Sequence, residues 1–423
     1  MISTMPSQSA NQTVLSFEQA RHVVEEHASH LRPAGKELVE LLDSVGLVLA
    51  EPVTADRNIP PFPRATRDGY AVHAADLARL PATLQVVGEI KAGAQTNLKL
   101  EAGQAASIMT GAAAPPGADA VVMLEYSSQK GNRVEITRAV QAGENIVPTG
   151  SEAKRGDRLL SPGLRLDHVA ISVAASVGRS RLLVYSKPRV AVLSTGDEVV
   201  DIDVPPSAHQ IRNSNTYSLA AQVQAAGGEP VLLPIAPDET ERLRELMAEG
   251  FDADLLLLTG GVSMGKYDLV EQVLSDLKAE FFFTGALIQP GRPIVFGRLP
   301  YSSSAATTES PNKYFLGLPG NPVSTMVTFE LFARPVLEAL AGMTPRKLVF
   351  FHAKLKFEVK TKPGLKRFLP ATLSGELEHA EVELVRWQGS GDIAAMARAD
   401  CYMVVPPDRE HIPAGEWVAV LLR

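Results

Sequence analysis

Three short apolar runs, each ending in a glycine turn, constrain the fold of this chain more than any other feature. Unbroken apolar runs suit parallel strands that are covered on both faces. A glycine after the strand allows a sharp turn, which brings backbone N–H groups close to a ligand. Since the carboxyl ends of parallel strands meet at one edge of an open α/β sheet, the turns are predicted to line one ligand crevice. The runs with their turns are Arg189–Leu193 with Ser194-Thr195-Gly196, Leu255–Leu258 with Thr259-Gly260-Gly261, and Phe315–Leu318 with Pro319-Gly320.

The remaining pattern predicts several domains around this sheet. A chain of 423 residues is too long for one ordinary core. Strand and helix patterns alternate over residues 188–344, as is typical of βαβ units on a parallel sheet. Short β-patterned runs between glycine and proline turns predict a small β domain upstream, and strand patterns return after residue 345. The predicted fold class is therefore multidomain α/β plus β.

Local patterns predict where helices begin. Phe17–Leu31 is predicted to be helical with Ser16 as its N-cap, and Gly35–Val45 is predicted to form a second helix. Asp167 is predicted to cap a helix over Val169–Ser176. Asp238 precedes a further helical pattern and fits an N-cap, with Glu241 completing a capping box. This structural interpretation of Asp238 competes with a functional one.

Composition narrows the classes of partner. A net charge of −7 gives no support for binding to nucleic acid or to an anionic membrane surface. Cys401 is the only cysteine, which excludes an intramolecular disulfide and a cysteine-based zinc site and fits a reducing cytoplasm. Residues 1–13 lack the apolar core of a signal peptide, and no apolar run has the length of a membrane span. We expect a soluble, cytoplasmic protein.

The turn after Leu258 nearly matches a phosphate-binding P-loop. Gly260–Tyr267 follows a strand and contains the pattern GxxxxGK, but Tyr267 replaces the serine or threonine that ligates Mg²⁺. No convincing partner aspartate ends a neighbouring apolar strand, so a P-loop NTPase is a poor match. A glycine-rich, anion-binding turn at a helix N-terminus remains predicted, because backbone amides need no particular side chain.

Carboxylates and a guanidinium near the strand ends suggest what the crevice binds. Mg²⁺ prefers one or two carboxylates together with phosphate oxygens, so acidic residues beside anion-binding glycines suit a Mg²⁺-bound phosphate. Arg292 in a proline-rich loop and Ser324 in the first turn of a helix suit an oxyanion. No Ser-His-Asp order, nucleophilic cysteine or Schiff-base context is present, so no covalent catalyst is predicted. The acidic residues are Asp197, Glu198, Asp238 and Asp268.

Six motifs, in this order, resemble those of the molybdopterin molybdenumtransferase family of molybdenum cofactor biosynthesis, which includes the gephyrin E domain. They are Pro60-Pro61-Phe62 with Asp68-Gly69-Tyr70-Ala71, Met109-Thr110-Gly111, Ser194-Thr195-Gly196-Asp197-Glu198, Thr259-Gly260-Gly261-Val262-Ser263-Met264-Gly265 with Asp268, Pro290-Gly291-Arg292-Pro293, and Leu318-Pro319-Gly320-Asn321-Pro322-Val323-Ser324. The resemblance implies an elongated N-terminal domain, an inserted β domain, an α/β molybdopterin-binding domain and a C-terminal β-barrel. Their expected ranges are 14–70 with 148–187, 71–147, 188–344 and 345–423.

The resemblance also implies a reaction, in which molybdenum from molybdate is inserted into adenylylated molybdopterin with Mg²⁺ and AMP is released. It implies a homodimer whose clefts are each completed by the partner's N-terminal domains, and other cofactor-biosynthesis proteins are candidate partners. By this resemblance the catalytic residues are Asp68, Thr110, Glu198, Asp238 and Asp268, of which Asp238 and Asp268 bind the metal. The substrate-binding residues are Thr195, Gly196, Asp197, Gly260, Gly261, Ser263, Pro290, Arg292, Pro293, Ser324, Lys366, Arg367 and Ser390.

Departures from the family pattern keep alternatives open. Pro63-Arg64-Ala65 stands where the family usually has Asp-Asn-Ser, and Lys266 stands where it often has aspartate. Gln289 replaces a lysine of the usual Lys-Pro-Gly-Lys and removes one cation from the oxyanion site. By hypothesis, Arg64, Arg67 and Lys266 restore that charge. The alternatives are a paralogue that uses tungstate and a non-catalytic scaffold of the same fold.

Overall fold

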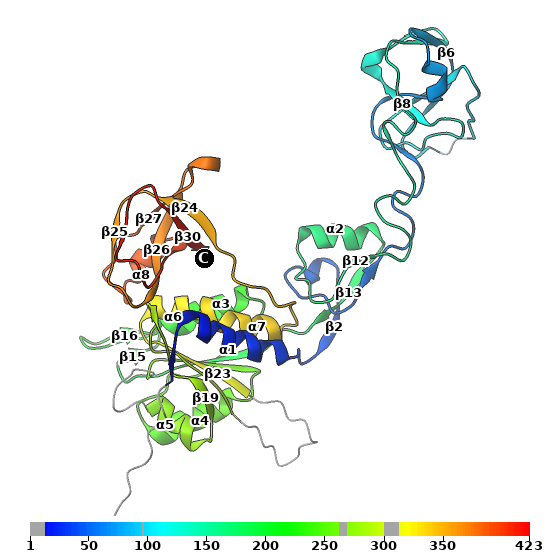
Figure 1. Ribbon diagram of the computed structural model, residues 1–423. Helices are drawn as coiled ribbons and strands as arrows, with labels where there is room; N and C mark the ends of the chain where they lie inside the picture. Colours follow the sequence, from blue (N-terminus) through cyan, green and yellow to red (C-terminus); the bar gives the residue numbers. More distant parts are fainter. Residues whose placement is uncertain (1–12, 95–96, 262–268, 300–312) are drawn as a thin grey trace, which may run out of the picture.

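A computed structural model describes residues 13–94, 97–261, 269–299 and 313–423. Figure 1 shows an α/β domain, a C-terminal β domain beside it, and a long arm that carries another β domain at its far end. The predicted class, multidomain α/β plus β, is confirmed.

The sheet of the α/β domain has six strands in the order β17-β14-β18-β23-β22-β19. The three apolar runs form neighbouring parallel strands, β14, β18 and β23, and β17 continues the parallel part. β22 runs antiparallel to β23 and to β19, so the sheet is mixed rather than wholly parallel. The bounds are β14 Arg189–Ser194, β17 Glu229–Leu232, β18 Leu255–Thr259, β19 Glu280–Phe283, β22 Val295–Leu299 and β23 Lys313–Leu318.

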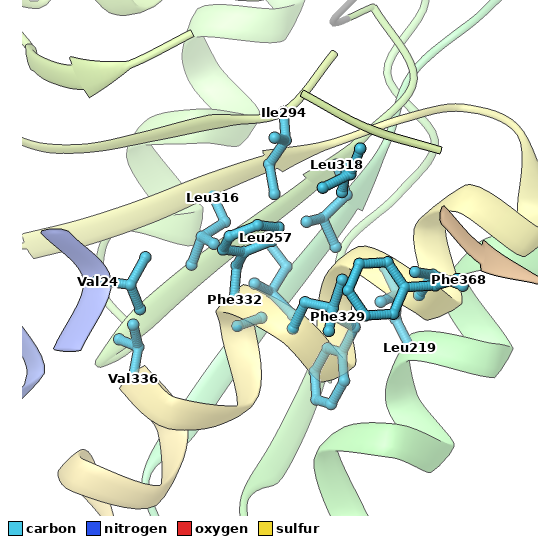
Figure 2. Packing of buried hydrophobic residues seen from close by; sticks show 14 of the residues in the cluster. Val24, Leu219, Leu257, Ile294, Leu316, Leu318, Phe329, Phe332, Val336 and Phe368 are labelled. Atoms are coloured by element: carbon cyan, nitrogen blue, oxygen red, sulfur yellow. The ribbon is translucent and has the colours of Figure 1, made fainter. Parts of the chain in front are cut away.

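Helices cover both faces of this sheet. α1, α3, α6 and α7 pack on one face, and α4 and α5 pack on the other. Figure 2 shows the core on the first face, where Leu257 and Leu316 of the sheet lie near Phe332 of the helical layer. No helix in the described ranges has both the length and the apolarity needed to cross a membrane. The bounds are α1 Phe17–His30, α3 Ser214–Ala225, α4 Thr240–Gly250, α5 Leu269–Asp276, α6 Pro322–Thr328 and α7 Arg334–Leu340, with a π-helical turn at Phe329–Ala333.

The first helix lies on the α/β domain although its sequence precedes the arm. The predicted N-cap is confirmed, because the Ser16 side chain accepts a hydrogen bond from the Gln19 N–H and the Gln19 side chain accepts one from the Ser16 N–H. Phe17, Ala20 and Val24 are buried in the same core as the sheet. Burial of this apolar face anchors the N-terminal segment to the domain that carries the strand-end turns.

The helix predicted for Gly35–Val45 is wrong. Lys36–Glu40 forms β2, which pairs antiparallel with β13 (Arg181–Tyr185), and a short 3₁₀ turn follows at Leu42–Ser44. Lysine, glutamate and leucine favour a helix locally, but propensity is a weak force that tertiary pairing overrides. The partner strand is distant in sequence, so a local pattern does not reveal it.

The arm consists of two segments of the chain, one that runs outward to about residue 70 and one that runs back from about residue 145. The two segments are joined by the antiparallel strand pairs β2–β13, β3–β12 and β4–β11. Helix α2 packs beside these pairs and begins at the predicted cap Asp167. The bounds are β3 Val53–Thr54, β4 Arg64–Ala65, β11 Ile146–Val147, β12 Arg158–Leu160 and α2 His168–Ser176. The β domain at the far end has the strand order β8-β5-β7-β6-β10-β9. These strands are β5 Gly69–Val72, β6 Ala82–Ile90, β7 Gln104–Ile108, β8 Ala120–Met123, β9 Ser127–Lys130 and β10 Arg133–Ile136.

The C-terminal domain is a closed barrel. Its strands run in the order β26-β27-β24-β30-β28, and β28 pairs back with β26. The short strand β21 (Ile288–Gln289) of the α/β domain pairs parallel with β26, which joins the two domains. The remaining bounds are β24 Phe351–Leu355, β26 Lys366–Ser374, β27 Glu381–Leu384, α8 Ile393–Arg398, β28 Cys401–Val405 and β30 Trp417–Leu422.

Candidate functional site

The carboxyl ends of β14, β18 and β23 border one cavity of about 900 Å³. All three turns line it, as the sequence predicts, and residues of the barrel domain close one side. A cavity of this size at strand ends is typical of a small-molecule site. The lining residues from the turns are Ser194, Thr195, Gly196, Glu198, Thr259, Gly260, Gly261, Pro319, Gly320, Asn321 and Pro322.

Glycine is required where the turns after β14 and β18 meet. Gly260 has φ +90° and Gly261 has φ +61°, in the left-handed region that favours glycine. A Cβ on Gly260 would lie 2.5 Å from the carbonyl oxygen of Thr195, and a Cβ on Gly261 would lie 2.9 Å from the Thr195 hydroxyl. The absence of side chains therefore permits the close approach that forms this part of the cavity.

Two asparagines beside the start of α3 hold the turns in place. Asn213 caps the helix by accepting from the Thr216 N–H at 3.1 Å. Asn215 donates through Nδ2 to Thr259 Oγ1 at 2.9 Å and to the Gly320 carbonyl oxygen at 2.7 Å, so one side chain joins the ends of β18 and β23. Neither asparagine is predicted as a site residue from the sequence pattern. Asparagine directly before a helical pattern is a capping signal that could have found Asn213.

Asp238 is not the N-cap that the sequence predicts. α4 begins at Thr240 with Glu239 in the cap position, and no side chain caps it. The Asp238 N–H instead donates to Asp197 Oδ1 at 3.0 Å, and Asp238 lines the cavity. The helix therefore starts one residue later than the sequence predicts. The prediction that Asp238 caps this helix is wrong, and Asp238 is instead one of the residues that line the cavity.

The acidic residues around Asp238 affect its protonation. Removal from water raises the pKa of the Asp238 carboxyl, and the negative charges of Asp197 and Glu198 raise it further. Within the described ranges no three metal-ligating side chains form a ready-made cluster. Mg²⁺ needs only one or two protein carboxylates when phosphate oxygens complete its shell, so Asp197, Glu198 and Asp238 fit this ion. Asp268 and Ser263, also predicted here, lie outside the described residues.

Among the predicted oxyanion residues, Arg292 and Ser390 are next in sequence to Pro293 and Gly391, which line the cavity, but Arg292, Ser324 and Ser390 are not themselves among its lining residues. The N–H of Val323 donates to the Ser390 carbonyl oxygen at 2.9 Å, which joins the start of α6 to the barrel loop. A Cβ on Gly291 would lie 3.6 Å from the Ser324 carbonyl oxygen, so the loop from Gln289 to Pro293 packs against the same helix. Pro290 and Ser324 are buried, Arg292 is exposed, and Pro293 lines the cavity.

The two predicted basic residues of the barrel are placed differently. The Lys366 ammonium is hydrogen-bonded to Glu18 and lies 4.9 Å from the ring centre of Phe17, outside the cavity lining. Arg367 is buried, donates to the Leu365 carbonyl oxygen, and pairs along the strand with Gln289. Burial lowers the pKa of the Arg367 guanidinium. Their roles toward an oxyanion remain predictions.

Asp68 and Thr110 lie together at the far end of the arm. The Thr110 N–H donates to Asp68 Oδ1 at 2.7 Å, and this bond lowers the pKa of the Asp68 carboxyl. No described residue of the arm or its β domain lines the cavity of the same chain, and Figure 1 shows the two regions far apart. Arg64, predicted to supply charge to the oxyanion, is paired with Glu152 at 2.8 Å in the arm. Lys266 lies outside the described residues.

Three family models together match most of the chain. They are the MoeA N-terminal region (domain I and II) over residues 15–178, a probable molybdopterin binding domain over 191–339, and the MoeA C-terminal region (domain IV) over 352–422. Among solved structures, a molybdopterin biosynthesis moeA protein from Pyrococcus horikoshii matches with a TM-score of 0.76 and 27% identity, covering 97% of this chain and 100% of that one.

Curated relatives match over nearly the full length. A molybdopterin molybdenumtransferase from Nostoc sp. is 34% identical over 91% of this chain and 88% of its own length. A protein of the same name from Haemophilus influenzae is 32% identical over 96% of this chain and 98% of its own length. On these matches, the chain belongs to the molybdopterin molybdenumtransferase family.

Proposed function

We propose that this protein inserts molybdenum from molybdate into adenylylated molybdopterin and releases AMP. The observation that carries the proposal is the cavity at the strand ends, which is bordered together by the glycine turns, by carboxylates and by Pro293 of the Arg292 loop. The names of the curated relatives agree with a transferase that acts on molybdopterin.

The acidic residues and Arg292 have different proposed roles, which follow from their charges. We propose that Asp238, with Asp268, holds Mg²⁺, and that Asp197 and Glu198 support it. Mg²⁺ would supply positive charge to a phosphate that these carboxylates would otherwise repel. The Thr195–Gly196 and Gly260–Gly261 turns would offer backbone N–H groups to the nucleotide or pterin part. Arg292, Ser324 and Ser390 would hold the molybdate dianion at the barrel side.

We further propose that the protein acts in the cytoplasm as a homodimer in which the arm of one subunit completes the cavity of the other. The support is the position of Asp68 and Thr110, whose hydrogen bond presents an ionised carboxylate at the far end of the arm, remote from the cavity of the same chain. An arm of this length can place that carboxylate over a second subunit. Other proteins of molybdenum cofactor biosynthesis remain candidate partners that deliver or accept the pterin.

Molybdate-dependent AMP release tests the proposed reaction. The purified protein is incubated with adenylylated molybdopterin and Mg²⁺, with and without molybdate, and AMP and reconstitution of an apo-molybdoenzyme are measured. Both signals are expected to appear only with molybdate. AMP release that responds to tungstate in preference to molybdate would favour the tungstate paralogue. A folded protein with neither signal would favour the scaffold.

Subunit mixing tests the shared cavity. Asp68→Ala and Asp238→Ala are each expected to be inactive as homodimers, since each removes a carboxylate from every site. After the two variants are unfolded, mixed in equal amounts and refolded, about half of the dimers are mixed, and each mixed dimer has one intact site. The mixture should regain roughly a quarter of wild-type AMP release. If each cavity used only its own chain, the mixture would stay inactive.

A further inference from the structure

The cavity is lined by a basic side chain as well as by carboxylates. Glu198 and Asp238 line it, and Asp197 is in contact with Asp238. Arg212 is the only lysine or arginine among the described residues that line the same space. Arg212 is not predicted as a site residue from the sequence pattern. A ligand with a phosphate group would be repelled by the acidic side and attracted to this guanidinium.

The backbone around Arg212 is held in a defined position. β16 (Ile211–Arg212) pairs parallel with β15 (Val199–Val200), just beyond the Gly196 turn. The N–H of Ile211 donates to the Glu198 carbonyl oxygen at 2.8 Å, and the N–H of Asn213 donates to the Val200 carbonyl oxygen at 2.8 Å. These bonds fix the strand on which Arg212 lies beside the cavity.

The guanidinium is oriented but not neutralised. Its Nε donates to the carbonyl oxygen of Ile202 at 3.0 Å, which restrains the plane of the group. No carboxylate of the described chain lies within ion-pair distance of Arg212, in contrast to Arg64, whose guanidinium is paired with Glu152. An arginine restrained through one nitrogen keeps the other two for a forked contact with two phosphate oxygens.

Further donors face the same space. Arg212 is followed by the N-cap Asn213 and by the first turn of α3, a helix of 12 residues, whose Ser214 and Asn215 line the cavity. Thr195 also lines it, is 5% exposed, and has a hydroxyl with no hydrogen-bond partner among the described residues. A buried hydroxyl without a partner is costly, which indicates that a ligand group supplies the missing bond. A helix N-terminus and a hydroxyl donor both favour an anion.

We propose that Arg212, together with the first turn of α3 and the Thr195 hydroxyl, binds the phosphate of the nucleotide part of the ligand. Arg212 thereby determines specificity for the phosphorylated nucleotide over its nucleoside. The inference rests on the proposed function for the identity of the nucleotide, but the anion site itself follows from the charges and donors. The carboxylates are left for a cation on the opposite side of the same phosphate.

Equilibrium binding of AMP, adenosine and inorganic phosphate tests this assignment by calorimetry with Mg²⁺ present. The wild-type protein should bind AMP more tightly than adenosine. Arg212→Gln should weaken AMP binding by about 10- to 100-fold and leave adenosine binding unchanged. Arg212→Lys should bind AMP with an affinity between those of the wild type and Arg212→Gln, because lysine keeps the positive charge but cannot make a forked contact with two phosphate oxygens. Arg189→Gln is the matched control, since this exposed arginine begins β14 at the end away from the cavity and should bind AMP as the wild type does.

The outcomes separate the inference from the proposed function. AMP binding by Arg212→Gln that equals that of the wild type overturns the inference, as does a wild-type protein that binds neither AMP nor phosphate. Phosphate binding that depends on Arg212 without any AMP binding supports the anion site and removes the nucleotide from it. Arg212-dependent AMP binding in a protein without molybdate-dependent AMP release supports the inference while the insertion reaction fails. Unchanged thermal unfolding of Arg212→Gln shows that its fold is retained.

Discussion

Gly260→Ala is expected to lower the free energy of unfolding by about 2–5 kcal/mol and to remove most AMP release. Two costs add. The residue has φ +90°, which strains any residue with a Cβ, and that Cβ would lie 2.5 Å from the Thr195 carbonyl oxygen. Since the carbonyl belongs to the backbone, it moves only if the turn after β14 moves. Urea unfolding followed by circular dichroism measures the stability, and the AMP assay measures the site.

Gly227→Ala is the matched control for the steric part of this effect. Gly227 lies in the same domain with φ +95°, but its nearest neighbours would be 3.9 Å from an added Cβ. It should show the cost of backbone strain alone, about 1–2 kcal/mol, with AMP release retained. Equal losses in the two variants would mean that the close approach of the two turns contributes nothing beyond the strain.

The crevice could be predicted from sequence because its signals are local. An unbroken apolar run with glycine directly after it defines a buried parallel strand and its turn within a few residues, as at Leu255–Gly261. The three turns meet because adjacent parallel strands end at the same edge, which is a property of the fold class rather than of any one contact. The caps at Ser16 and Asp167 were predictable for the same reason.

The failures occur where a distant segment decides the local structure. The local pattern at β2 predicts a helix, but its partner β13 belongs to the returning segment of the arm and is distant in sequence. The local pattern at Asp238 predicts a helix cap and does not reveal its contact with Asp197, which joins one strand-end turn to another. Arg212 was missed because only the pairing of β15 with β16 brings it to the cavity. In each case the residue type gave no warning, since lysine, aspartate and arginine are ordinary surface residues.

Asp238→Asn should separate activity from stability. The substitution keeps the shape of the side chain and the N–H that donates to Asp197, but it removes the charge that we assign to Mg²⁺. AMP release is expected to fall by more than about 100-fold. Asp252→Asn is the control, because this exposed aspartate precedes β18 at the end away from the cavity.

The same substitution, Asp238→Asn, should raise the free energy of unfolding although it lowers the activity. Burial and the charges of Asp197 and Glu198 raise the pKa of Asp238 above its ordinary 3.8, so the folded protein holds this proton to higher pH than the unfolded chain does. Stability is therefore lost as pH rises from the ordinary pKa through the raised one, and the cost persists at neutral pH. Asp238→Asn carries no such cost, so its unfolding midpoint in urea should exceed that of the wild type at pH 7 and converge with it below pH 3.8.

A less stable Asp238→Asn protein at pH 7 would show that this carboxylate is stabilised by its neighbours and not repelled by them. If activity falls and stability rises, the electrostatic repulsion among Asp197, Glu198 and Asp238 lowers stability but is retained for function. Like charges held close together are unfavourable in the isolated protein and become favourable when a divalent cation binds. Added Mg²⁺ should then raise the unfolding midpoint of the wild type more than that of Asp238→Asn, because the variant keeps Asp197 and Glu198 but has lost one of the carboxylates that would bind the ion.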